Sequence, residues 1–335
     1  MLSDRRQRVL YALIEEYVAR AFPVGSRTLT ERYKLGVSPA TVRNDLSALE
    51  DAGYITQPHT SAGRIPTDAG YRAFVDDLMN SAPFDNHPFP EVVAQLRHTA
   101  GELDDLMAAT SAALTKLTDC LSIVVAPALI ASHIRQFSLI SLSNYQALVV
   151  IVAEDGQVVN RQISFNEEVT PDALAEVQRL LNDIFAGKSM ADMKRNVEQD
   201  QLAALQDPLT QIILEEVILG MNENNLGKTH RLGMSALLRK PEFSTSEALL
   251  PVIQVLEDNT VILKIVDDMM NAEGDTMVRI GHENAAEEFA GVSVIAGQYG
   301  RGEGAGVVAV IGPTRMDYNR VLGAVRAARS ALQDE

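Results

Sequence analysis

The segment from Ser38 to Ser47 combines small polar side chains with one arginine and one asparagine at helical spacing. Arginine can bond O6 and N7 of guanine, asparagine can bond N6 and N7 of adenine, and small neighbours let a helix approach base edges closely. These residue types therefore predict recognition of bases in the major groove of DNA. The predicted contacts on this helix are Ser38, Thr41, Arg43, Asn44 and Ser47. We expect Arg43 to matter most for the choice of base.

Three predicted helices would position this face. The first carries apolar residues at i, i+3, i+4 and i+7 from Leu10 to Tyr17, with Ser3 as its cap, and the second begins at Ser26. The third runs from Pro39 to Asp51, because serine caps a helix well and proline suits the first helical position. Two helices joined by a tight turn are typical of a helix-turn-helix. A solvated face on a small helical bundle is the alternative interpretation.

A predicted hairpin follows the third helix. Residues 54–59 favour a short strand, residues 64–66 favour its return, and the turn between them contains hydroxyl groups and a glycine. A hairpin in this position is a wing, whose side chains could reach phosphates or the minor groove. The predicted contacts on the wing are His59, Ser61 and Arg64. Thr67 is expected to cap the next helix.

The run SPATVRNDLSALEDAGYITQPHTSAGRIPTDAGYR, from Ser38 to Arg72, resembles the signature of the bacterial heat-inducible transcription repressor family HrcA. Its part from Thr56 to Thr67 is the most specific, because other winged helices do not share it. The later blocks LLRKPEF, IGHEN and GVVAVIGPTRMDYNRVL are similar to C-terminal motifs of the same family. The resemblance covers both ends of the chain, and residues 187–233 contain no matching motif.

The expected fold class is α+β multidomain, in which a winged helix-turn-helix precedes a GAF-like α/β domain with an inserted dimerisation segment. Here the GAF-like fold and the dimerisation segment are implied by the resemblance. The expected divisions are a DNA-binding domain at 1–79, a linker at 80–90, a GAF-like domain at 91–186 and 234–335, and the inserted segment at 187–233.

The resemblance implies a homodimer that represses chaperone operons by binding double-stranded DNA at an inverted-repeat operator, the CIRCE element. It also implies that the GroEL chaperonin keeps the repressor active. When heat occupies the chaperonin with unfolded clients, repression would be lost. The alternative is a winged-helix regulator gated by a small-molecule ligand of the GAF-like domain. Fold alone does not decide between the two.

Charge is distributed unevenly along the 335 residues. The net charge is −16, yet residues 1–71 contain nine Lys or Arg and eight Asp or Glu, so the remainder has a net charge of −17. A nearly neutral DNA-binding segment on an acidic body predicts modest affinity for random DNA. We expect a cytoplasmic protein, because the start lacks an apolar signal region and no segment is apolar enough to span a membrane.

No catalytic machinery is predicted. Cys120 is the only cysteine and the six histidines are scattered, which argues against a zinc site or a nucleophilic centre, and no cofactor is expected. Cys120 is expected to be a buried thiol. The alternating glycines from Gly300 to Gly306 lie between two predicted strands, which favours a hairpin loop over a phosphate-binding loop. An enzyme is the least favoured class.

Three further expectations concern structure. Apolar residues from Leu96 to Leu117 recur in a heptad-like stripe, which suits packing either against a partner helix or, as we favour, within the same chain. Strands are expected at 134–142, 146–152, 158–165, 277–280, 292–298 and 307–311, and helices at 171–185 and 318–332. Arg315 and Asp317 are expected to pair where the last helix begins, with Thr314 as its cap.

Overall fold

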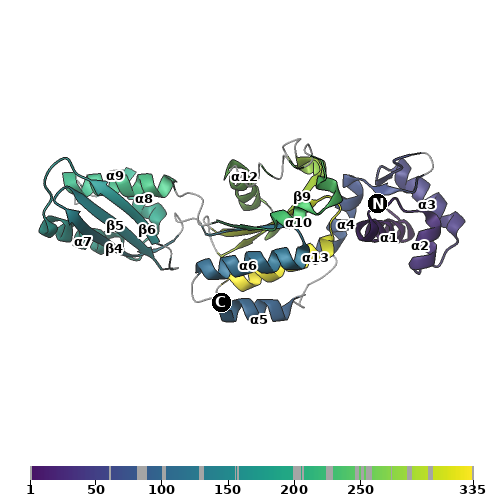
Figure 1. The fold of residues 1–335 in the computed structure, drawn as a ribbon, viewed down its shortest axis with the longest axis horizontal. Coiled ribbons are helices and arrows are strands. Elements are labelled where there is room, and N and C mark those ends of the chain that lie inside the picture. Colours follow the sequence, from purple (N-terminus) through teal and green to yellow (C-terminus); the bar gives the residue numbers. More distant parts are fainter. Residues whose placement is uncertain are drawn as a thin grey trace.

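The computed structural model arranges the chain as three units in a row, with a helical unit at one end and a small sheet with three helices at the other (Figure 1). The described residues are 2–59, 62–80, 89–99, 103–127, 132–154, 156, 158–198, 205, 207–223, 229–245, 249, 253, 259–272, 274–284, 289–300 and 305–333. Within these ranges, no helix is long and apolar enough to cross a membrane.

The N-terminal unit is a winged helix. Its elements are α1 (Asp4–Arg20), α2 (Ser26–Arg32), α3 (Pro39–Asp51), β1 (Ile55–Thr56), β2 (Ile65–Pro66) and α4 (Asp68–Asn80). The predicted third helix has the expected limits, and Ser38 caps it by accepting the backbone N–H of Thr41 at 3.2 Å. Thr67 caps α4 through the N–H of Gly70. Ser3 precedes α1 without a side-chain capping bond, and the cap position of α2 is Gly25, one residue before the expected serine.

The central unit, called the body below, is built on an antiparallel sheet in the order β7-β3-β10-β9-β8. Its strands are β3 (Leu121–Val125), β7 (Thr229–Leu232), β8 (Thr276–Ile280), β9 (Val292–Tyr299) and β10 (Gly306–Pro313). The central strands β3, β9 and β10 are buried on both faces, which explains their almost continuous apolar sequences. β9 and β10 pair antiparallel across the glycine-containing connection, so this connection joins two strands rather than a strand and a helix.

Helices cover both faces of this sheet (Figure 1). One face packs on α6 (Leu103–Thr118) and α13 (Tyr318–Leu332), and α5 (Pro90–Thr99) lies outside these two. The other face packs on α10 (Met234–Leu238), the short helix η3 (Pro241–Phe243) and α12 (Asn259–Met270). A further short helix, η4 (Gly281–Glu283), follows β8.

The third unit is formed by residues between β3 and β7. It is an antiparallel sheet in the order β4-β5-β6, and three helices pack on one of its faces. Its elements are β4 (Ile134–Ser143), β5 (Gln146–Ala153), β6 (Val158–Ser164), α7 (Pro171–Phe185), α8 (Met190–Glu198) and α9 (Pro208–Glu223).

This arrangement differs from the expected division, which placed the inserted segment at 187–233. The chain leaves the body after β3 and returns at β7, which pairs with β3, so the excursion begins near residue 132 and ends near residue 223. The expected division places residues 134–164 in the GAF-like domain, because a strand pattern does not show which sheet a strand joins. Only the pairing of Val125 with Thr229 reveals the return point.

The heptad-like stripe packs within the same chain. Leu96 of α5 lies against Ala327 and Ala331 of α13, while Met107 and Leu114 of α6 are in the core beneath the sheet. Ala100 of the stripe lies outside the described residues. Cys120 is buried, as expected, and burial raises the pKa of its thiol to about 11.

The expected pair between Arg315 and Asp317 is wrong. Asp317 itself caps α13 by accepting the N–H of Arg320 at 3.0 Å, so Thr314 is not the cap. The Arg315 guanidinium instead pairs with the Glu242 carboxylate and donates to the backbone carbonyl of Val18 in the winged helix. The sequence could not indicate this, because the partners lie 73 and 297 residues away.

The position of Leu114 gives a test of how the stripe packs. Leu114→Ala should lower the free energy of unfolding by about 2–5 kcal/mol, because it leaves a cavity between α6 and the sheet. Since the contact is within one chain, the loss should be the same at every protein concentration. Denaturant titrations at several concentrations check this. A loss that grows on dilution would show that the stripe packs against a partner instead.

Candidate nucleic-acid interface

The outward face of α3 is exposed. The side chains of Arg43, Asn44 and Ser47 are exposed and, among the described residues, form no hydrogen bond or ion pair. Ser38 and Thr41 lie at the start of the same helix, where their hydroxyl oxygens are 3.0 Å apart. The structure therefore brings all five predicted helix residues together at one end of the molecule. Three of them are available to an outside partner without breaking a contact.

The buried side of α3 is fixed by an ion pair to α1. Asp45 is almost completely buried, and its carboxylate accepts hydrogen bonds from Arg5 at 2.8 and 3.0 Å. Arg6 is a second cation, 3.6 Å from the same carboxylate. The hydrogen bond from Arg5 holds the pKa of Asp45 below its ordinary value. This charged anchor complements the apolar contacts of Val42, Leu46 and Leu49.

The wing is tied to its surroundings through Arg64. The backbone of Arg64 exchanges hydrogen bonds with Val24 at 2.8 and 2.9 Å, which places β2 beside the chain that leads into α2. Its guanidinium donates to Glu50 of α3 at 2.7 and 3.1 Å. Arg64 therefore holds the wing against the last turn of α3. The sequence predicts only a DNA contact for Arg64, because nothing in the spacing links it to Glu50.

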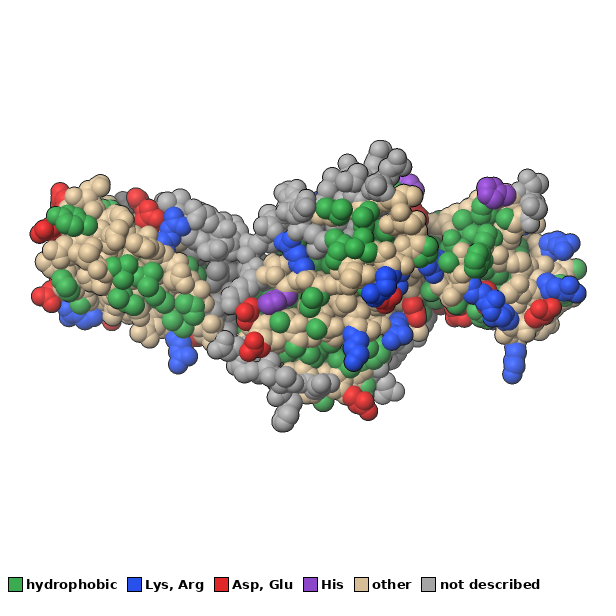
Figure 2. Space-filling model, in the orientation of Figure 1, with side chains coloured by type: hydrophobic (Ala, Val, Ile, Leu, Met, Phe, Trp, Pro, Cys, Tyr) green, Lys and Arg blue, Asp and Glu red, His purple; other side chains and the backbone are tan. Residues whose placement is uncertain are grey.

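Of the other two predicted wing residues, His59 is among the described residues. His59 is exposed in the bend three residues after β1, and Ser61 lies outside the described residues. Gln57 donates to the carbonyl of Ala62 at 2.8 Å, which closes the turn. Figure 2 shows several Lys and Arg side chains at the far end of this unit, where α2 and α3 lie. A further cation on this end, not among the predicted contacts, is Arg27 of α2, whose side chain is 87% exposed.

Two glycines of the TSAGRIPTDAGY segment are required by close packing. A Cβ at Gly63 would collide with the backbone of Pro23 and Val24, and one at Gly70 would collide with the carbonyl of Tyr54. Much of this sequence therefore builds the scaffold that holds α3.

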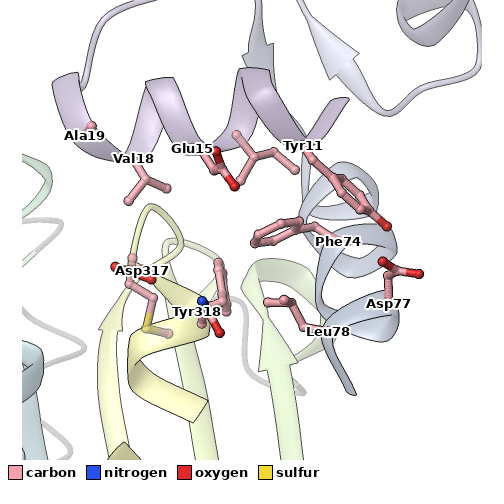
Figure 3. A pocket seen from close by; sticks show the side chains of 12 residues that line it. Tyr11, Glu15, Val18, Ala19, Phe74, Asp77, Leu78, Asp317 and Tyr318 are labelled. Carbon is pink, nitrogen blue, oxygen red and sulfur yellow. The ribbon is translucent and has the colours of Figure 1, made fainter. Parts of the chain in front are cut away.

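A cavity of about 480 Å³ lies where the winged helix meets the body. Figure 3 shows it between α1, α4 and the start of α13, with Phe74, Leu78 and Tyr318 along its walls. Glu15 and Asp317 also line it, and both burial and the nearby Asp317 raise the pKa of Glu15.

Comparison with known proteins identifies the family. The family model described as "HrcA protein C terminal domain" matches residues 104–322, and a DeoR-like helix-turn-helix model matches residues 12–67. The chain belongs to the HrcA family. The heat-inducible transcription repressor HrcA of Streptomyces avermitilis is 40% identical over 98% of this chain and 96% of its own length. That of Acetivibrio thermocellus is 32% identical over 99% and 96%.

HrcA proteins are heat-inducible transcription repressors, so this chain is a regulator with a helix-turn-helix DNA-binding domain and not an enzyme. The expected family is thereby confirmed, and so is the expected α+β multidomain fold class with an N-terminal helix-turn-helix. A solved structure, described as a hypothetical protein at 2.2 Å resolution, is similar over 99% of this chain and 98% of its own, with a TM-score of 0.67 and 24% identity. This likeness supports the fold.

The anchor at Asp45 predicts a pH-dependent stability. Asp45→Asn should lower the free energy of unfolding by about 1–3 kcal/mol at neutral pH, because charge-assisted hydrogen bonds to α1 are lost. The pKa of Asp45 is lowered in the folded chain, so its contribution is present above the unfolded value and is lost as the pH falls through the folded value.

The difference in melting temperature between the native chain and Asp45→Asn should therefore be largest above about pH 5 and shrink in stronger acid. Circular dichroism melts across this range measure it. Asp51→Asn, at the exposed end of the same helix, is the matched control. A difference that does not change with pH would show that the ionised carboxylate is not what stabilises α3.

Proposed function

We propose that the chain acts as a homodimer that represses chaperone operons by binding the inverted-repeat CIRCE element, and that the GroEL chaperonin keeps it active. The observation that carries the DNA part is the exposed face of α3, where Arg43, Asn44 and Ser47 have no partner among the described residues. An exposed guanidinium and amide on a recognition helix can read base edges at little cost, because no internal contact must be broken first.

The predicted contacts divide into two roles in this proposal. Arg43 and Asn44 read bases, while Ser47, Thr41 and Ser38 contact bases or phosphates close to the helix. His59 and Ser61 on the wing reach the neighbouring backbone. Arg64 contributes to DNA binding chiefly by holding the wing against Glu50, and its remaining donor capacity can meet a phosphate. Arg27 on α2 adds a phosphate contact, since the first helix of such motifs crosses the DNA backbone.

The third unit has a surface that suits dimerisation. In its sheet, one face is buried under α7, α8 and α9. On the other face the registers place Ile140 beside Leu148 and Val158 beside Val152. Ile140 is 48% exposed, Leu142 51% and Val158 55%. Within the described residues no helix or strand covers these exposed apolar side chains, and burying them against a second copy would be favourable. A two-fold dimer through this face would present two recognition helices to an inverted repeat.

The chaperonin part of the proposal derives from the family resemblance of the sequence motifs. Chaperonin that is free of clients would promote the DNA-binding form of the repressor. On heating, unfolded clients occupy the chaperonin, the repressor loses activity, and transcription of the operons rises. The measurable consequence is that purified chaperonin strengthens binding of this chain to the operator, and that a chaperonin loaded with an unfolded client does not.

The cavity beside Glu15 and Phe74 favours a second candidate function, control by a small molecule. It lies between the winged helix and the body, not within the GAF-like domain to which the sequence analysis assigned the ligand. A ligand there would contact both units and could change their relative position. Thermal-shift measurements with chaperonin and with a metabolite panel separate the two modes of control. Stabilisation by a metabolite alone would favour the second.

Replacement of Arg43 tests the DNA-binding face. Arg43→Ala should cost about 1–3 kcal/mol of binding free energy on the inverted repeat and should reduce the preference for it over a scrambled duplex. Fluorescence anisotropy with both labelled duplexes at physiological salt measures this. Arg27→Ala is the control, because a lost phosphate contact weakens binding to both duplexes alike. Equal weakening of both duplexes by Arg43→Ala would contradict base recognition by Arg43.

Charge on the open sheet face tests the dimer. Ile140→Glu combined with Val158→Glu should convert the chain to a monomer in sedimentation velocity and weaken binding to the inverted repeat, because two linked half-sites bind more tightly than one. Both side chains are about half exposed, so the melting temperature of each unit should change little. Glu176→Lys, on the outer side of α7, is the control. A dimer that survives the double replacement would place the interface elsewhere.

A further inference from the structure

The first contact between the winged helix and the body is made by Asp68, at the start of α4. Its carboxylate accepts the backbone N–H of His282 at 3.0 Å and lies 2.7 Å from the Nδ1 atom of that histidine. Gly281 has a φ of +53°, and an added Cβ there would collide with the Asp68 carboxylate. The loop after β8 is therefore shaped to receive this aspartate.

The second contact is made one turn later by Arg72. Its Nε donates to Glu283 at 2.7 Å, and its Nη2 pairs with the same carboxylate and donates to the carbonyl of Val278 at 2.7 Å. Glu283 is held in place because it also accepts the N–H of Ile280 at 2.9 Å. Asn284 fixes the other side of the loop through three backbone carbonyls. The IGHEN motif thus forms a preorganised receptor for α4.

The third contact is made on the opposite side of the junction, by the body itself. Arg315 donates to the carbonyl of Val18 near the end of α1 at 2.6 Å and is braced by Glu242. Between these contacts the rings of Tyr71 and Tyr318 lie 5.4 Å apart, and one cluster of buried residues continues from α1 and α4 into α13. The winged helix and the body therefore share a core as well as three polar contacts.

From these contacts we infer that Asp68 and Arg72 are positioning residues that fix the direction of the recognition helix relative to the body, and thereby set which spacing of operator half-sites the dimer accepts. This inference rests on the proposed function. Neither side chain needs to touch DNA for this role. Because HTH dimers read half-sites about one helical turn apart, a rigid joint favours one spacing and rejects a half-turn change.

The inference predicts a defect that is specific to paired half-sites. If the joint is flexible, the two winged helices of a dimer can reach half-sites at several spacings. The effective concentration of the second winged helix at a half-site with the correct spacing then falls. The variant Asp68→Ala/Arg72→Ala should therefore bind a single half-site like the native chain. On the paired operator it should bind more weakly, and it should lose most of the native preference for correct spacing.

The experiment compares three duplexes by anisotropy: a single half-site, the inverted repeat, and the inverted repeat with five base pairs inserted. The native chain should prefer the inverted repeat over the inserted version by at least about tenfold, and the double variant by no more than about threefold. Arg72→Lys, which keeps the charge but not the bidentate contact, should be intermediate. Arg195→Ala, which removes an exposed ion pair on α8, should behave like the native chain.

Calorimetry provides a readout that does not involve DNA. The shared core and the polar contacts together predict that the winged helix and the body of the native chain unfold in one transition, and loss of the polar contacts in the double variant should separate this into two transitions. A double variant that keeps native spacing preference and a single transition overturns the inference. Loss of binding to the single half-site as well would also overturn it, because the residues would then support the winged helix itself. A native chain without operator preference contradicts the proposed function, while the calorimetric result still decides the role of the joint.

Discussion

The junction between the winged helix and the body determines how the recognition helix is presented. Tyr71 of α4 and Tyr318 of α13 lie in one buried cluster, so each unit shields apolar side chains of the other from water. Burial of these apolar side chains stabilises the junction, and the polar contacts of Asp68 and Arg72 fix the orientation of the winged helix on the body. The exposed face of α3 is therefore carried at a defined angle to the body.

The motifs that identify the family have different structural roles in this chain. Most of the segment after α3 is scaffold: Gly63 and Gly70 permit close backbone approach, and Arg64 braces the wing against Glu50. The IGHEN and LLRKPEF motifs, which contain no DNA contact in this account, lie at the junction with the winged helix. Arg43, Asn44 and Ser47 belong to the first signature and, among the described residues, form no hydrogen bond or ion pair within the chain.

Features that depend on residues close together in the sequence were predictable, and contacts between distant segments were not. Helix limits such as Pro39 to Asp51 were predictable, because capping and the apolar period act within a few residues. The outward face of α3 was predictable for the same reason. The pairing of Arg72 with Glu283, 211 residues apart, and the return of the chain at β7 were not, because local patterns do not show which distant elements meet. The assignment of Arg64 was incomplete for the same reason.

If the recognition helix is held rigidly on the body, spin labels on the two units must stay at one fixed distance from each other. Labels at Ser47→Cys on α3 and Lys264→Cys on α12 occupy exposed sites, while the native Cys120 is buried. Labelled chains diluted with unlabelled chains report distances within one molecule by pulsed electron resonance. One narrow distance distribution is expected. A broad distribution would mean that the winged helix moves freely relative to the body, and that the junction is not rigid.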